Sequence, residues 1–167
     1  MNELSNNLDG YRLSTYLHKN RNEKLKIGPI WDFNLSFGNG NYCNGDKYDT
    51  WTYKFNETCS DDFWLIPFWW EKLLEDPYFV NKLKERWNEL RKKELSDENI
   101  FQMIQNYISI LKNESGGIYR NYSKWNVIGK YLWPNNYVGN SYESEIDYLI
   151  KWIAKRNNWL DKSINEL

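Results

Sequence analysis

The sequence predicts an α+β fold that is predominantly helical, with one small β element near residues 24-33. Two observations support this prediction. Lys24 to Ile27 alternates polar and apolar side chains, which is the pattern of a half-buried strand. Beyond residue 62, apolar side chains return every three or four positions over several long stretches, which is helical spacing. The 167 residues suffice for one domain with a buried core.

Residues 1-62 are expected to form the β-containing segment of this single domain. A turn followed by a helix is predicted over residues 6–19, with Leu13, Tyr16 and Leu17 on its inner side. The predicted strand comes next and ends at a glycine and a proline, both of which interrupt regular structure.

Residues 38–62 hold mostly Gly, Asn, Asp and Thr, and they predict a long loop of a kind that is usually functional or mobile. Cys43 and Cys59 lie within it. In an exported protein these two cysteines would pair and close the loop, whereas in a cytosolic protein they would be free thiols. A zinc site is not expected, because no CxxC is present and His18 is the single histidine.

Residues 63-167 are expected to form a helical body. Asp76 is a natural N-cap and Pro77 suits the first helical position, so a helix is predicted to begin there. Ser96 is expected to cap the next helix. The other helices are predicted over residues 62–76 with a break at Pro67, over residues 118–132, and over residues 143–164.

The composition limits the classes of partner. With 22 basic and 23 acidic side chains the net charge is −1, so no overall field attracts nucleic acid, and no nucleic-acid partner is expected. No apolar run has the length of a transmembrane helix, so no membrane span is expected. The first ten residues show no signal peptide, having neither a basic start nor an apolar stretch.

Aromatic residues make up 18% of the chain, which indicates a core of large rings and ring faces free for a ligand. Two loops, Tyr48 to Tyr53 and Trp133 to Tyr137, combine such rings with Asn or Asp. Flat rings stack on sugars while amides and carboxylates bind hydroxyl groups. One hypothesis is therefore a non-catalytic glycan-binding or scaffold module of an exported bacterial assembly, with glycan contact through these aromatic loops.

Two acids stand out by their surroundings, Asp9 in "NNLDGYRLS" and Asp32 in "GPIWDFNLSFG". The predicted helix and strand between them would allow both to face one cleft. Phosphoryl transfer uses such a pair, because one carboxylate orients the attacking hydroxyl while another holds the magnesium that bridges the nucleotide phosphates. The alternatives are structural: Asp9 would cap the helix that follows it, and Asp32 would form an internal salt bridge to Arg12 or Lys26.

The run "NLDGYRLSTYLHK…KLKIGPIWDFNLSFGN" resembles the core of the CotH kinase family, named for a bacterial spore-coat protein with an atypical protein-kinase-like fold. The stretches "PFWWEKLLEDPYFVNKLKERWNELR" and "VGNSYESEIDYLIKWIAKRNNWLD" are similar to the helical tail of exported members. The resemblance covers nearly the whole chain. It implies the C-terminal-lobe portion of that fold, and an ATP-dependent and Mg²⁺-dependent transferase that phosphorylates Ser or Thr of other proteins.

The resemblance also implies roles for individual residues. Asp32 would bind magnesium, and Asp9 would take the catalytic position that aligns the substrate hydroxyl. Ser14 stands where kinases have a metal-binding Asn, and Asn34 stands where many relatives have a second Asp, so both would be weaker magnesium ligands. The rings on either side of the metal-binding acid, Trp31 and Phe33, would wall the site and exclude water.

A kinase-like site also needs a lobe with a phosphate-covering loop and a lysine that holds the nucleotide phosphates. Nothing before Asn6 can supply these parts, and the sequence contains no Walker-type GxxxxGK[ST] pattern. We therefore expect a piece of an exported protein, of the cell surface or periplasm, that is inactive alone. The kinase hypothesis requires Asp9 and Asp32 to converge on one open cleft. A carboxylate fixed by a deeply buried arginine would instead indicate a structural role.

Overall fold

The computed structural model describes the backbone of residues 1–114 and 116–167, and all of their side chains except those of 113 and 114. Helices account for 48% of the chain and accompany a small antiparallel sheet, which confirms the predicted α+β class with mostly helical content. In that sheet Leu17 lies opposite Ile27, and His18 lies opposite Lys26. No helix among the described residues combines the length and the apolar character that crossing a membrane requires.

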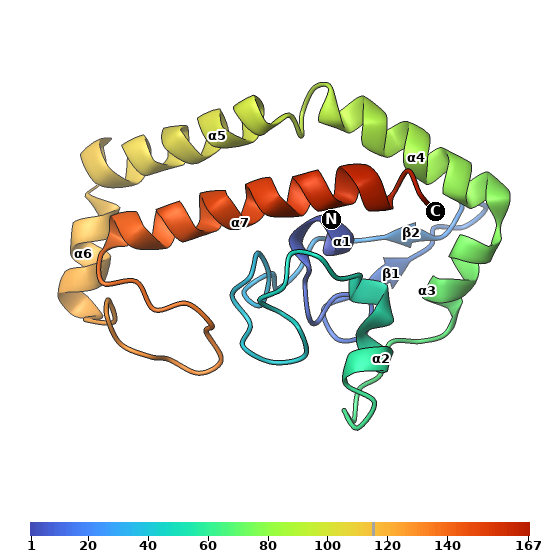
Figure 1. The fold of residues 1–167 in the computed structure, drawn as a ribbon, viewed down its shortest axis with the longest axis horizontal. Helices are drawn as coiled ribbons and strands as arrows, with labels where there is room; N and C mark the ends of the chain where they lie inside the picture. Colours follow the sequence, from blue (N-terminus) through green and yellow to red (C-terminus); the bar gives the residue numbers. More distant parts are fainter. Residues whose placement is uncertain (115) are drawn as a thin grey trace.

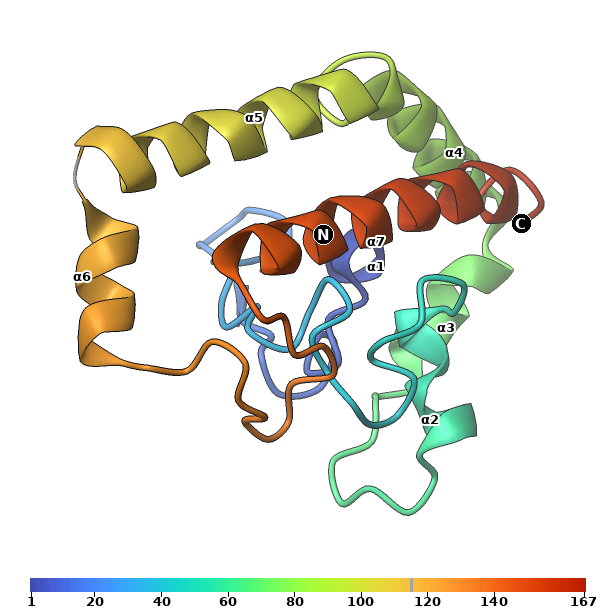
Figure 2. The same cartoon turned by 60° about the vertical axis from the view of Figure 1, so that its left-hand side comes forward.

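Short elements come first along the chain and long helices follow (Figure 1). α7 runs beneath the arc that α4 and α5 form, and it lies between that arc and the N-terminal segment, in both Figure 1 and Figure 2. The elements are α1 (Asn2–Ser5), β1 (Leu17–His18), β2 (Lys26–Ile27), η1 (Thr52–Lys54), α2 (Phe55–Thr58), α3 (Trp69–Lys72), η2 (Leu73–Glu75), α4 (Pro77–Arg91), α5 (Asp97–Ser109), η3 (Ile110–Glu114), α6 (Gly117–Lys124) and α7 (Tyr142–Ser163).

The predicted helix starts are confirmed where a capping side chain signals them. The Asp76 carboxylate accepts a hydrogen bond from the Tyr78 amide at 2.9 Å, and Pro77 is the first residue of α4. Ser96 caps α5 by accepting from the Asn99 amide at 3.2 Å. Each side-chain oxygen satisfies an N–H group that the first helical turn leaves without a backbone partner.

The helix predicted over residues 6–19 is wrong. This segment consists of turns and ends in β1, and the three side chains expected to face inward are exposed. Asn6 and Tyr11 have φ angles of 46° and 70°, in the left-handed region, which a right-handed helix does not tolerate. The predicted strand is confirmed as β2, but both of its residues are exposed, so it is not half-buried.

Other predicted boundaries shift for local reasons. The helix expected over residues 62–76 begins only at Trp69, after Pro67, and finishes as a 3₁₀ turn. The helix expected over residues 118–132 ends at Lys124, because Trp125 leaves the helical conformation with ψ of 89°. The predicted loop of residues 38–62 is irregular except for η1 and α2 near its end.

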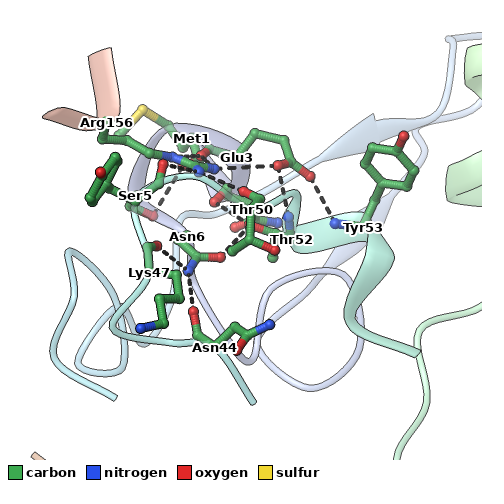
Figure 3. A network of polar contacts seen from close by, with 12 residues as sticks. Met1, Glu3, Ser5, Asn6, Asn44, Lys47, Thr50, Thr52, Tyr53 and Arg156 are labelled. Carbon is green, nitrogen blue, oxygen red and sulfur yellow. Dashed lines mark hydrogen bonds and ion pairs between the residues drawn. The ribbon is translucent and has the colours of Figure 1, made fainter. Parts of the chain in front are cut away.

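A fully buried arginine ties α7 to the N-terminal segment (Figure 3). Arg156 donates from Nε to the carbonyl of Glu3 at 3.1 Å, and from Nη1 to the carbonyl of Tyr48 at 2.8 Å. Burial lowers the pKa of Arg156 to about 10, which leaves it charged at neutral pH. The Glu3 carboxylate in turn accepts a hydrogen bond from the Thr52 amide at 2.9 Å. α7 therefore fixes both α1, just before Asp9, and the segment that leads into η1.

Candidate functional site

Asp9 lies in the tight turn that follows α1. Its neighbour Leu8 is buried in a cluster with Leu35 and Phe55, which anchors the turn in the core. The Asp9 backbone carbonyl accepts from the amides of Leu13 and Ser14, at 3.0 and 2.8 Å. No helix begins here, so the interpretation of Asp9 as a helix cap is wrong.

The side chain of Arg12 organises the surroundings of Asp9. It is only 3% exposed, and its Nη2 donates to Oδ1 of Asp9 at 2.9 Å. Nη1 donates to Oδ1 of Asp62 at 3.0 Å and to the carbonyl of Trp64 at 2.8 Å. Nε donates to the carbonyl of Leu8 at 2.9 Å. One guanidinium thus joins the Asp9 turn to the segment around residue 62.

Burial and several neighbouring charges act on the pKa of the Asp9 carboxyl. Burial raises its pKa, and the Arg12 guanidinium opposes this rise by favouring the charged form. The negative charges of Asp32 and Asp62 raise the pKa of Asp9 further. Asp32 is therefore near enough to act electrostatically on Asp9. Arg12 pairs with Asp9 and Asp62, and Asp32 adds a third negative charge near them.

Asp32 lies beside this cluster with its side chain exposed to solvent. Its φ angle of 56° places it in the left-handed region, which Asp tolerates better than most residues do. No ion pair within the described part of the chain involves it: Lys26 pairs with Glu23, and Arg12 pairs with Asp9 and Asp62. The interpretation of Asp32 as a partner of Arg12 or Lys26 is wrong, so its carboxylate is available to a ligand.

A cavity of about 320 Å³ adjoins the residues on either side of Asp32. Trp31, Phe33 and Ser14 all line it, together with the ring of Tyr11. The described lining residues do not include Asp9, Asp32 or Asn34. Trp31 and Phe33 both line this cavity, and Trp31 is 55% exposed, so the wall that the resemblance implies around Asp32 stays a prediction. The predicted site residues are therefore neighbours without enclosing one pocket.

The predicted magnesium ligands form no closed cage. Among the described residues, no group of three or more His, Cys, Asp or Glu side chains is placed to hold a metal ion. Asn34 is exposed, and its backbone carbonyl accepts from Nδ2 of Asn39 at 2.9 Å. Ser14 is buried at the cavity, 8% exposed. Magnesium is commonly bound through one or two carboxylates with water and substrate phosphates, so a closed protein cage is not a requirement for it.

Sequence reasoning missed three members of the site, Asp62, Tyr42 and Asn7. Burial raises the pKa of the Tyr42 hydroxyl, and the Asp9 charge raises it further, which places Tyr42 beside the same acids. Asn7 is fully buried, and its Oδ1 accepts from the Asp9 amide at 3.3 Å. Its Nδ2 finds no acceptor within the described part of the chain. The pairing of Arg12 with Asp9 was also missed, although their spacing of three residues was a usable signal for it. No local pattern points to Asp62 or Tyr42.

Cys43 and Cys59 form a disulfide, with their Cα atoms 5.7 Å apart. Of the two expectations, the structure therefore agrees with the paired state that an exported protein would have. Both cysteines pack against the cluster that contains Leu8 and Phe55. Because Cys59 lies just before Asp62, the bond holds the base of the segment that Arg12 contacts.

The two aromatic loops differ in exposure. Trp51 packs against Trp159, with ring centroids 4.9 Å apart, and is partly buried, so the first loop does not present this ring to a ligand. Trp133 in the second loop is 76% exposed, and it stacks on Tyr42 at 6.5 Å with the planes 12° from parallel. The largest exposed ring in the two loops is therefore Trp133, while Tyr48 of the first loop is 36% exposed.

Comparison with protein-family models matches residues 1–160 to one family, described as CotH kinase protein. The matched range contains both acids and all of the predicted metal ligands. No curated protein matches the chain, and no solved structure does.

Proposed function

The chain belongs to the CotH kinase protein family, and on that premise we propose that it carries the acidic half of a phosphoryl-transfer site. The transfer runs from ATP to serine or threonine hydroxyls of another protein. The fold proposed with it is the C-terminal-lobe portion of a protein-kinase-like domain. The family match supports this proposal, and the arrangement of the two acids supports the division of roles between them.

The observation that carries the proposal is the electrostatic coupling of Asp9 and Asp32. Two acids far apart in the sequence come near enough for the charge of one to raise the pKa of the other. Two negative charges that act on each other favour a cation between or beside them. A phosphoryl-transfer site uses such a cation together with a second acid that orients the attacking hydroxyl.

A magnesium ion is the cation that we propose for this site. Asp32 would hold it through an exposed carboxylate that has no ion pair among the described residues, with Asn34 and Ser14 as weaker oxygen donors. When bound, magnesium neutralises and positions the phosphates of ATP. The aromatic wall of Trp31 and Phe33 limits one side of the approach to Asp32.

Asp9 is proposed to orient the acceptor hydroxyl. Arg12 bonds to Oδ1, and this contact fixes the carboxylate plane while Oδ2 remains the oxygen that can accept the hydroxyl hydrogen bond. The same contact supports a purely structural role, since the guanidinium is buried. The substitution Asp9→Asn separates the two roles, because its amide oxygen still accepts from Arg12 while the charge is lost.

An oxidising compartment is proposed for the protein, at the cell surface or in the periplasm. The disulfide between Cys43 and Cys59 supports this location, since such bonds persist mainly in exported proteins.

Metal binding tests the proposal directly. Manganese serves as a paramagnetic probe for the magnesium site, and two-dimensional NMR of labelled protein follows the signals that it broadens. We expect saturable broadening centred on residues 31–34 and 9–14, displaced by excess magnesium and lost in Asp32→Asn. The matched control is Asp61→Asn, another exposed acid of the same region. Broadening that survives Asp32→Asn, or that Asp61→Asn abolishes equally, contradicts the assignment of Asp32.

Phosphate transfer tests the claim that the chain carries only the acidic half. Incubated with γ-labelled ATP, magnesium and a serine-rich acceptor protein, the 167-residue chain should incorporate no label above a no-enzyme control. The physical reason is that its sequence has no identified phosphate-covering loop or nucleotide lysine. Robust incorporation that is lost in Asp9→Asn would show that the whole site lies within these residues.

A further inference from the structure

A second pocket lies away from Asp9 and Asp32, where the loop between α6 and α7 meets residues 39–41 (the orange segment in Figure 2). Its volume is about 220 Å³. The Asn41 amide donates to the carbonyl of Pro134 at 2.9 Å, and the Asn136 amide donates to the carbonyl of Asn39 at 3.0 Å. The two segments are therefore held together by backbone hydrogen bonds. The side chains that give the pocket its polar character are Asn39, Tyr122, Lys130, Asn135, Tyr137 and Glu145.

Several of these polar groups are free to bind a ligand. The side-chain amide of Asn135 and the ammonium of Lys130 have no hydrogen bond or ion pair to another described side chain. The Tyr137 hydroxyl is likewise without a partner in the described part of the chain, while its ring is stacked on Tyr148 at 4.4 Å. Glu145 uses Oε1 to accept from the Gly139 amide at 2.6 Å, which leaves its second oxygen for a ligand.

This set of groups suits a polyhydroxylated ligand. Amides and phenols donate and accept neutral hydrogen bonds, and one ammonium and one carboxylate add a charged donor and a charged acceptor, all of which sugar hydroxyls can use. A phosphate ligand is disfavoured, because the one cation, Lys130, is accompanied by the anion of Glu145. Aliphatic side chains of Val127 and Ile128 supply an apolar patch for the C–H face of a ring. The volume lies below the roughly 300–1,000 Å³ of pockets for drug-sized ligands, and it suits a single sugar ring.

An exposed aromatic platform belongs to the same loop. Trp133 is 76% exposed and lies in the chain between two pocket-lining residues, Leu132 and Asn135. Stacking on Tyr42 fixes its orientation. An indole face of this kind stacks on sugar rings through their C–H groups. A glycan longer than one sugar would therefore find a second contact beside the pocket.

We propose that this pocket binds one sugar unit of a glycan, with Asn135 and Tyr137 contacting its hydroxyls and Trp133 supporting the adjoining unit. The site is independent of the proposed phosphoryl transfer. Two contacts join the regions. Asn39 lines the pocket and donates from Nδ2 to the carbonyl of Asn34 at 2.9 Å, and Trp133 stacks on Tyr42.

The test is saturation-transfer-difference NMR with methyl glycosides of glucose, galactose, mannose, N-acetylglucosamine and glucuronic acid, followed by titration of any binder. We expect saturable millimolar binding of at least one of them and tighter binding of its disaccharide. Asn135→Ala and Tyr137→Leu should each weaken the binding at least tenfold, whereas Trp133→Ala should remove only the gain from the second unit.

Three controls make the result decisive. Asn158→Ala alters an exposed Asn on α7, outside the pocket, and should bind normally. Asp32→Asn should also bind normally, which separates this proposal from the proposed function. The melting temperature of each variant shows whether the fold is kept, and Tyr137→Leu gives a second answer if Asn135→Ala unfolds. Binding of no glycoside in the panel, or binding that folded pocket variants leave unchanged, would overturn the proposal.

Discussion

Arg12 donates from Nη2 to Oδ1 of Asp9 at 2.9 Å, although its own side chain is almost completely buried. The guanidinium also lies 4.1 Å above the ring of Phe55. A charge so far from water is costly unless its donors are satisfied, and the carbonyls and carboxylates around it satisfy them. This contact therefore fixes the geometry of the candidate site and contributes to the stability of the fold.

Arg12→Met tests that dual role. Because removal of the guanidinium leaves Asp9 and Asp62 partly buried without a cation, we expect the free energy of unfolding to fall by about 3–5 kcal/mol. Urea unfolding followed by tryptophan fluorescence measures this loss. The matched control is Arg86→Met, whose ion pair with Glu89 is exposed and should matter little. Equal effects of the two substitutions would show that Arg12 is not a structural anchor.

Arg156→Lys tests the tie between α7 and the N-terminal segment. Lysine keeps the charge but cannot reach the carbonyls of Glu3, Tyr48 and Thr50 together, because it lacks the planar fork of arginine. We expect the free energy of unfolding, measured by urea titration, to fall by about 1.5–3 kcal/mol. Hydrogen exchange should also quicken at residues 2–8. If protection there stays at the wild-type level, Arg156 does not hold this segment.

The disulfide gives a third prediction. Replacing both Cys43 and Cys59 by serine removes a cross-link between residues 16 apart in sequence, which in the chain-entropy account stabilises by about 3 kcal/mol. The melting temperature should drop in the double variant, and it should drop similarly when the wild type is treated with a dithiol reductant. The reductant should leave the variant unchanged. A wild-type protein insensitive to reductant would contradict a stabilising bond.

Asp97, at the start of α5, gives a prediction about pH. A hydrogen bond from Arg91 lowers the pKa of this carboxyl, burial opposes the shift, and Asn157 adds a second hydrogen bond. The stabilisation is present above the ordinary value of 3.8 and is lost as the pH falls through the lowered pKa. The melting temperature of Asp97→Asn should lie below that of the wild type at pH 6. The two curves should converge toward pH 2.5, and a constant gap would contradict the assignment.

The starts of α4 and α5 were predicted correctly, because their signals are local. Asp76, Pro77 and Ser96 act within one helical turn, so their effect depends little on the rest of the fold. The segment over residues 6–19 was mispredicted because its apolar spacing suits a helix, while Asn6 and Tyr11 take left-handed conformations and bond to the distant residues Asn44 and Trp70. Periodicity alone contains no information about such contacts.

The candidate site was predicted only in part, because several of its contacts join residues that are far apart in the sequence. Asp9 and Asp32 stood out by their flanking residues, and the charge of Asp32 raises the pKa of Asp9. Neither acid lines the cavity beside them, and Asp9 is bonded to the buried guanidinium of Arg12, so convergence on one open cleft stays a prediction. The partner of Asp9 was missed, since Arg12 was considered only as a partner of Asp32. Asp62 joins the cluster across 50 residues of chain, through a guanidinium whose direction no sequence pattern specifies.

The proximity of Asp9 and Asp32 is the central claim, and the titration of the Asp9 carboxyl tests it most directly. Carbon-13 NMR of aspartate-labelled protein follows this carboxyl from pH 2 to 8 in the wild type and in Asp32→Asn. The wild-type pKa should lie above the ordinary value of 3.8, and it should fall in Asp32→Asn because a neighbouring negative charge is gone. The same Asp9 pKa in both proteins would contradict a shared site for the two acids.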